Sequence, residues 1–136
     1  VYDRVCRVAM DYQTLDEELA IVAREAQGSG SGPLGSRAAR VTRATRDHAD
    51  VRVGSSVRGA IDLVLLADRL ADLRDASPTD DAIGIDAALA ALSGRVRVRE
   101  GCGRSAESIV RELWEATPLH VAAPTTTDDG DAGPKA

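Results

Sequence analysis

Aromatic side chains are nearly absent from this sequence of 136 residues, which contains no Phe, one Trp and two Tyr. The core must therefore be built from Ala, Leu, Val and Ile, and side chains of this kind suit closely packed helices. The length is typical of one domain and is enough for one modest core. We expect an all-α fold, a small bundle of four or five helices, with at most a short strand or hairpin near residues 95–100.

Long apolar runs, a signal peptide and a high net charge are also missing. No stretch approaches the ~18 apolar residues that a membrane-spanning helix needs, and the first residues lack the apolar core and cleavage site of a secretory signal. The formal net charge of −5 gives the chain as a whole no attraction to nucleic acid or to an anionic membrane. These features predict a cytoplasmic protein with no membrane span and no nucleic-acid partner.

Cysteine and histidine are scarce, and they form no recognisable set of ligands. Cys6 and Cys102 lie far apart without a CxxC partner, which favours two free thiols in a reducing cytoplasm over a disulfide or a metal site. His48 and His120 have no metal-ligand or nucleophile partner at a useful spacing. The Walker A pattern GxxxxGK[ST] and the GxSxG pattern are absent. We expect no metal site and no catalysis by this chain alone.

Shifts in composition divide the sequence into four parts, namely residues 1–26, 27–36, 37–116 and 117–136. The second part, QGSGSGPLGS, has the Gly/Ser-rich composition of a flexible linker. It ends in GPLGS, which a common cleavable tag also leaves behind, so the segment fits either an engineered linker or a natural loop. The last part is polar and rich in Pro, Gly and Thr, which predicts a disordered tail.

Apolar residues recur at helical spacing outside the linker and the tail. Thr14 and Glu17 have the spacing of a capping box and open a helix that should run to Ala26. A long helix begins after Ser55 or Ser56 and should run to about residue 76. Further helices are predicted over residues 37–47, 81–93 and 106–116, with Trp114 at the edge of the last apolar face. The predicted buried stripe of the long helix consists of Leu63, Leu66, Ala67, Leu70 and Leu73.

The stretch VRVGSSVRGAIDL, residues 51–63, places an arginine in the first turn of the long helix. The first turn of a helix has free N–H groups and the positive end of the helix dipole, which favour anions. A guanidinium gains nothing from that end of its own helix, but both groups can bind the same phosphate. Arg58 is therefore the candidate anion-binding residue. The alternative is an ion pair with a nearby carboxylate, such as an Asp at helical spacing.

The order of these segments resembles the lid region of MoxR-family AAA+ ATPases. Residues 44–59, ATRDHADVRVGSSVRG, match a phrase close to ATR-x-H-x-D-V-x-x-G-x-S-x-R-x that the family carries. SPTDDAIGIDAALAALSGRVRV resembles the proline-aspartate helix start and the basic segment that follow in the family. SAESIVRELWEATP resembles its closing helix, and YDRVCRVAMDYQTLDEELAIV resembles the segment that joins the ATPase core to the lid. The resemblance covers most of residues 2–118 apart from the linker.

The resemblance implies roles for individual residues. In AAA+ proteins the arginine at the start of this lid helix, called sensor 2, reaches the γ-phosphate of ATP, and Arg58 matches its position, with Gly54 and Ser56 beside it. Arg4 matches the arginine at the junction of core and lid, where it is expected to act as an arginine finger on a neighbouring subunit or to form a structural ion pair. The parent protein is expected to use ATP and Mg²⁺, whereas the isolated fragment is expected to hold no cofactor.

The resemblance further implies that residues 1–26 contain the end of the ATPase core and that residues 37–116 form the lid. The Walker A, Walker B and sensor 1 segments are absent, so we expect a fragment of a longer protein that forms a homo-oligomeric ring. Its partners would be the missing core, the neighbouring subunits, a von Willebrand A-domain protein and client proteins. Two alternatives from other classes stay open. One is a helical protein–protein interaction module, and the other is a winged-helix-like DNA binder that uses Arg95, Arg97 and Arg99.

Overall fold

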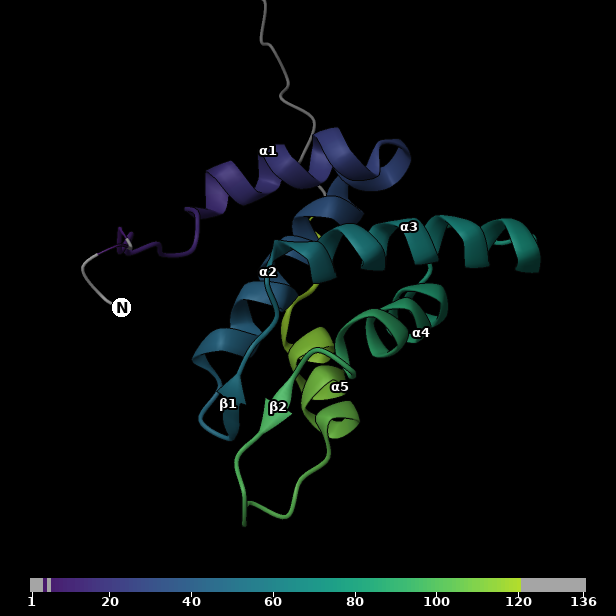
Figure 1. Cartoon of the computed structure of the whole chain (residues 1–136). Helices are drawn as coiled ribbons and strands as arrows, with labels where there is room; N and C mark the ends of the chain where they lie inside the picture. Colours follow the sequence, from purple (N-terminus) through teal and green to yellow (C-terminus); the bar gives the residue numbers. More distant parts are fainter. Residues whose placement is uncertain (1–3, 5, 121–136) are drawn as a thin grey trace, which may run out of the picture.

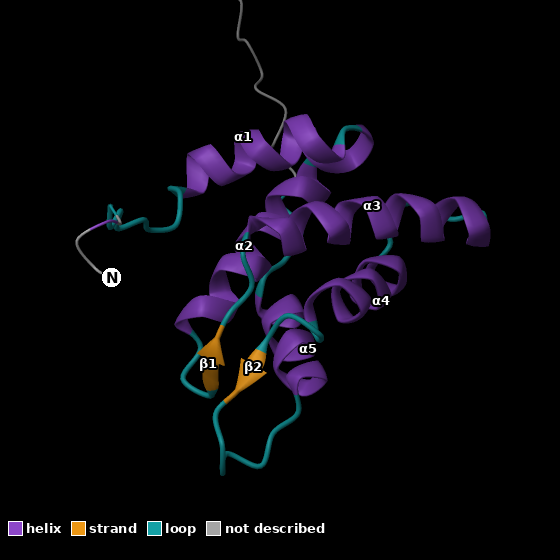
Figure 2. Ribbon diagram, in the orientation of Figure 1, coloured by secondary structure: helices purple, strands orange, loops and turns teal. Residues whose placement is uncertain are grey.

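The computed structural model describes residue 4 and residues 6–120 of the chain, and this part is mostly helical (Figures 1 and 2). Figure 1 shows α1 and α3 side by side, with α4 against α3 and α5 against α2. The predicted all-α bundle with one short strand region is confirmed. The elements are α1 (Leu15–Ala26), the short 3-10 helix η2 (Gly28–Ser31), α2 (Pro33–Asp47), β1 (Val51–Val53), α3 (Val57–Arg74), α4 (Asp81–Leu92), β2 (Arg97–Val98) and α5 (Ala106–Ala116).

Helix α1 begins with the capping box that the sequence predicts. The Thr14 hydroxyl accepts a hydrogen bond from the backbone N–H of Glu17, and the Glu17 carboxylate accepts one from the backbone N–H of Thr14. These two bonds satisfy donors that the first helical turn otherwise leaves free. The helix ends at Ala26, as predicted, because Gln27 takes a positive φ of 53°.

The Gly/Ser-rich segment 27–36 was expected to be a flexible linker, and that expectation is wrong. Its first half forms η2, and α2 begins at Pro33 rather than at residue 37. Ser29 donates its backbone N–H and its hydroxyl to the Asp68 carboxylate on α3, at 3.4 and 2.6 Å respectively. These bonds fix the turn between α1 and α2 to the long helix, so the segment is part of the folded bundle.

The glycines of this turn allow backbones to meet. A Cβ on Gly35 would stand 1.8 Å from the carbonyl oxygen of Gly30. A Cβ on Gly30 would in turn stand 2.8 Å from the carbonyl oxygen of Val22 on α1. Any side chain would push α1, η2 and the start of α2 apart, so the composition that resembles a linker serves close packing instead.

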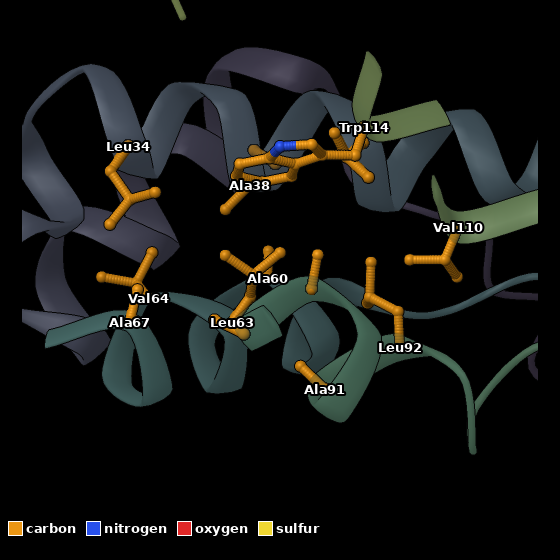
Figure 3. Close-up of a cluster of buried hydrophobic side chains, with 14 of the residues drawn as sticks. Leu34, Ala38, Ala60, Leu63, Val64, Ala67, Ala91, Leu92, Val110 and Trp114 are labelled. Atoms are coloured by element: carbon orange, nitrogen blue, oxygen red, sulfur yellow. The ribbon is translucent and has the colours of Figure 1, made fainter. Parts of the chain in front are cut away.

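The core lies between α2, α3, α4 and α5, and Figure 3 shows Leu34 and Ala38 of α2 facing Ala60 and Leu63 of α3. Many of the buried residues of α3 and α4 are small: Gly59, Ala60, Ala67, Ala71, Gly84, Ala87, Ala88 and Ala91. Each fully buried Leu contributes about 1.5–3 kcal/mol relative to an exposed one. The side chains that are less than 2% exposed and bulky include Leu34, Leu63, Leu92, Ile109 and Trp114.

The stripe predicted for the long helix is only partly right. Leu63 and Ala67 are fully buried, but Leu66 is 37% exposed and Leu73 is 82% exposed. The far end of α3 extends past its neighbours, and beyond Ala67 the buried residue is Ala71. Helical spacing identifies a face of the helix but not how far along it the other helices reach.

Trp114 was predicted at the edge of the apolar face of the last helix, but it lies in the core. Its side chain is buried, and a Cβ on Gly84 of α4 would stand 2.2 Å from the indole ring. The Arg37 guanidinium stacks on the indole ring at 3.6 Å from its centroid and donates to the Trp114 carbonyl oxygen at 2.9 Å. Arg37 and the indole N–H both bind the Asp81 carboxylate, at 3.0 and 2.9 Å. This anchor joins α2, the start of α4 and α5.

The indole hydrogen bond of Trp114, followed by the interaction with Arg37, holds the pKa of Asp81 below the usual value of an Asp carboxyl. A lowered pKa in the folded state stabilises the fold above the ordinary pKa and loses that stabilisation as pH falls through the folded-state value. We therefore expect Asp81→Asn to destabilise the protein at pH 7, by less than about 1 kcal/mol because the carboxylate is largely exposed. The difference from wild type should shrink below about pH 4. Urea unfolding followed by the fluorescence of Trp114 at both pH values measures it.

The two strands form a small antiparallel pair from distant parts of the chain. Val51 lies opposite Val98 and Val53 opposite Arg97, with an irregularity in register between them. Residues 95–100 thus contain a short strand, as predicted, but it pairs with the strand before α3 and makes no hairpin. No helix within the described residues is long and apolar enough to cross a membrane.

Candidate functional site

The loop before α3 is held firmly against α2. The Ser55 backbone N–H donates to the Thr45 hydroxyl at 2.9 Å, and its carbonyl oxygen accepts a hydrogen bond from Arg46 Nε at 2.7 Å. A Cβ on Gly54 would stand 2.7 Å from the Arg46 backbone. Gly54 therefore serves a backbone contact between the loop and α2, and its predicted role beside Arg58 in phosphate binding stays a prediction.

Ser56 is the residue that caps α3, although its side chain makes no capping hydrogen bond. Of the two serines, Ser55 is buried and Ser56 is exposed. The first turn of α3 therefore begins at a rigid loop, and the side chain at its N-cap faces solvent. The Ser56 side chain accepts no hydrogen bond from this turn, whereas the Ser56 carbonyl oxygen accepts one from the Gly59 backbone N–H at 3.0 Å.

Arg58 lies on the first turn of α3, and its side chain is 68% exposed. Its Nε stands 3.6 Å from Asp62 Oδ1, one helical turn further along. The ion pair that the sequence left open as the alternative for Arg58 is thus present. Exposed pairs of this kind contribute about 0.3–0.5 kcal/mol, so the contact orients Arg58 more than it stabilises the fold.

Asp62 binds a second arginine. Arg95, in the segment between α4 and β2, places Nη2 against Asp62 Oδ2, and its Nε donates to the Ala91 carbonyl oxygen at 3.1 Å. The two oxygens of one carboxylate are therefore shared between guanidiniums from two separate segments. The cluster of Arg58, Asp62 and Arg95 carries a formal charge of +1 and lies at the surface.

The Asp62–Arg95 pair forms one end of a groove between α3 and α4. The groove has a volume of about 460 Å³ and is open to solvent. Apart from that pair, its walls are apolar: Leu65, Leu66, Ala90, Ala91 and Gly94. Asp62 and Arg95 can therefore be reached from solvent through this groove.

A buried charged cluster that the sequence pattern does not predict joins α1 and α2. The Glu18 side chain is 1% exposed and contacts Arg46 Nη2 at 2.8 Å and Arg43 Nη1 at 3.0 Å. Arg43 also donates to the Gln13 carbonyl oxygen at 2.8 Å, and Arg46 stacks on Tyr12 at 3.9 Å from the ring centroid. Since Arg46 also binds the loop before α3, this cluster connects residues 12–18 to the loop that precedes the helix of Arg58. The sequence signal was a glutamate at a position of α1 that faces inward.

The other predicted site residues lie apart. Arg4 is exposed and its neighbours at positions 3 and 5 lie outside the described residues, so its role as an arginine finger stays a prediction. Cys6 is exposed and Cys102 half-buried, both as free thiols. His48 contacts the Glu112 carboxylate at 3.1 Å, and hydrogen bonds from Arg104, then from His48, lower the pKa of Glu112. Among residue 4 and residues 6–120, no three His, Cys, Asp or Glu side chains form a group suited to a metal ion.

Two of the three arginines proposed for a DNA-binding wing have partners within the molecule. Arg95 binds Asp62, and Arg99 donates its Nε to the Ala49 carbonyl oxygen at 2.8 Å. Strand β2 also pairs with β1, so the basic segment does not project as a hairpin. Both features disfavour a winged helix.

Comparison with protein-family models, with curated proteins and with solved structures gave no match to this chain.

Proposed function

We propose that this chain is the lid of a MoxR-like AAA+ ATPase and that Arg58 is its sensor-2 arginine. The parent protein would be a cytoplasmic ring that uses ATP with Mg²⁺ to remodel or mature client proteins, together with a von Willebrand A-domain partner. The chain alone would hydrolyse no ATP. The observation that carries the proposal is the exposed arginine on the first turn of α3, directly after a loop that is bonded to α2.

The donors present at this position suit a terminal phosphate. Arg58 offers N–H groups in a planar fork, and the first turn of α3 adds backbone N–H groups and the positive end of the helix dipole. Arg58 needs only to leave Asp62, a half-buried partner at 3.6 Å, to reach such a group. ATP with its Mg²⁺ would supply the phosphoryl group, and the ATPase core would supply the ligands that this chain lacks.

The loop before α3 is fixed to α2, so a contact between Arg58 and a phosphate would affect both helices. The Thr45 hydroxyl accepts a hydrogen bond from the Ser55 N–H, and Arg46 donates one to the Ser55 carbonyl oxygen. The loop before α3 is thereby fixed to α2, so a force on Arg58 would act on α2 and α3 together. Formation or loss of the contact between Arg58 and the phosphate would then rotate the lid as a rigid body rather than bend one loop. That movement is what a client-remodelling motor needs.

The test is steady-state ATP hydrolysis by the complete parent protein, with and without Arg58→Ala. We expect a fall in kcat of about 10²-fold or more, since one charge-stabilising donor is removed from the transition state. Arg69→Ala is the matched control, because Arg69 is an exposed arginine on the same helix. Assembly of each variant is checked by size-exclusion chromatography.

Hydrolysis that is unchanged by Arg58→Ala, or that falls equally with Arg69→Ala, would contradict the proposal. A parent protein without an ATPase core would contradict it as well. Each of these results would leave Arg58 as a partner of Asp62.

A protein-interaction module is the second candidate, and exposed apolar side chains support it. Leu73 is 82% exposed at the far end of α3, and Leu65 and Leu66 lie exposed in the groove between α3 and α4. This candidate predicts that partner capture is lost with Leu73→Ser and unaffected by Arg58→Ala or by nucleotide. The lid proposal predicts that capture changes with nucleotide.

A further inference from the structure

Two arginines from separate segments converge on one carboxylate at the start of α3. Arg58 comes from the first turn of α3, and Arg95 comes from the segment that follows α4. Their side chains are 68% and 40% exposed, whereas Asp62 between them is 27% exposed. Two guanidiniums that bind the two oxygens of one carboxylate are close enough together to bind two oxygens of one phosphate.

We propose that Arg58 and Arg95 form a two-arginine site for a terminal phosphate group and that Asp62 occupies this site in the resting state. Asp62 acts as a built-in competitor, because its carboxylate and a phosphate need the same donors. Phosphate binding would transfer both guanidiniums from Asp62 to the ligand. The inference rests on the proposed function for the identity of the ligand as a nucleotide, while the site itself is argued from the cluster.

The charges support this assignment. The pair of arginines contributes +2 and Asp62 contributes −1, so the resting cluster keeps one positive charge that is not neutralised. Arg58 has no other partner among the described contacts, and Arg95 keeps its bond to the Ala91 carbonyl oxygen when it leaves Asp62. That bond holds Arg95 in place while its terminal nitrogens change partner.

The position of Arg95 gives the site a role in coupling. Arg58 lies on α3, whereas Arg95 lies between α4 and β2, and β2 pairs with β1, the strand that leads into the loop before α3. A phosphate held by both arginines would therefore connect the start of α3 to the end of α4. Its release would return both arginines to Asp62, so the three residues would make the lid respond to the presence of the terminal phosphate.

The experiment is a titration of the 136-residue chain with inorganic tripolyphosphate at low ionic strength, followed by NMR or calorimetry. Wild type should bind weakly because Asp62 competes. Asp62→Asn should bind about fivefold more tightly or better, since a negative charge beside the ligand is removed. Arg58→Gln and Arg95→Gln should each weaken binding, and each should cancel the gain when combined with Asp62→Asn.

Matched control variants distinguish specific phosphate binding at the Arg58–Asp62–Arg95 cluster from a non-specific effect of net charge. Asp72→Asn removes one negative charge at an exposed position of the same helix, and Arg69→Gln removes one positive charge there. We expect both to leave the affinity close to that of wild type. Equal affinities for Asp62→Asn and Asp72→Asn would overturn the inference, and so would unchanged binding by Arg95→Gln. Thermal unfolding of each variant shows that it is folded at the temperature of the titration.

The two proposals fail in different ways. If tripolyphosphate binding depends on Arg58, Asp62 and Arg95 but the parent hydrolyses ATP without Arg58, the phosphate site stands and the lid proposal fails. If hydrolysis requires Arg58 but Arg95→Gln and Asp62→Asn leave the binding of tripolyphosphate unchanged, the two-arginine site fails and the sensor-2 assignment stands.

Discussion

Glu18→Ala is expected to lower the free energy of unfolding by about 3 kcal/mol. Glu18 is 1% exposed and faces Arg46 at 2.8 Å and Arg43 at 3.0 Å. Removing the carboxylate leaves the Arg46 guanidinium, which is itself 9% exposed, without a counter-charge in a place that water barely reaches. Chemical unfolding followed by circular dichroism measures the loss, and the midpoint of thermal unfolding should fall by about 10 °C.

The matched control for this prediction is Glu25→Ala on the same helix. Glu25 forms an exposed pair with Arg24 at 2.9 Å, and exposed pairs contribute about 0–1 kcal/mol. Glu18→Gln should lie between the two variants, because an amide can accept a hydrogen bond but carries no charge. A Glu18→Ala variant as stable as Glu25→Ala would mean that Arg43 and Arg46 find water, and that the cluster does not join residues 12–18 to the bundle.

The helices with a local signal were predictable from the sequence, because the forces that start and end them act within a few residues. The capping box at Thr14 and Glu17 placed the start of α1 correctly, and the apolar period of α3 identified its buried positions at Leu63 and Ala67. The exposed positions Leu66 and Leu73 were assigned wrongly. Their burial depends on whether another helix lies opposite, and the spacing of one helix carries no information on that.

In the candidate site, too, the local contacts were predictable from the sequence and the long-range contacts were not. Arg58 was found from its place at the start of a helix, and an Asp at helical spacing was named as its alternative partner, which proved to be Asp62. The second partner of that carboxylate, Arg95, is 33 residues away in sequence and comes from a different segment. Glu18 meets Arg43 and Arg46 in the same non-local way. Contacts of this kind follow from how the helices cross, so one sequence without its fold does not reveal them.

The composition of residues 27–36 fits two different structures, since Gly and Ser are favoured both where a chain must be flexible and where backbones must touch. The structure shows the second case, and Gly35→Ala distinguishes the two. A Cβ at this position would stand 1.8 Å from the Gly30 carbonyl oxygen, far inside van der Waals contact. We expect Gly35→Ala to lower the free energy of unfolding by about 3 kcal/mol or more, because η2 or α2 must shift and open the contact to α1. Chemical denaturation at equilibrium measures it.

Gly94→Ala is the matched control, because no atom lies within 4 Å of a Cβ built at Gly94. Its φ is not in the positive range, so alanine fits there and should change the free energy of unfolding by less than about 1 kcal/mol, in the stabilising direction. A flexible linker would give Gly35→Ala the same small effect, since alanine merely restricts the unfolded chain. Equal stability of the two variants would therefore return residues 27–36 to the role of a linker. A large loss confined to Gly35→Ala would show that the helical bundle depends on backbone contact between α1 and α2 at the Gly/Ser-rich turn.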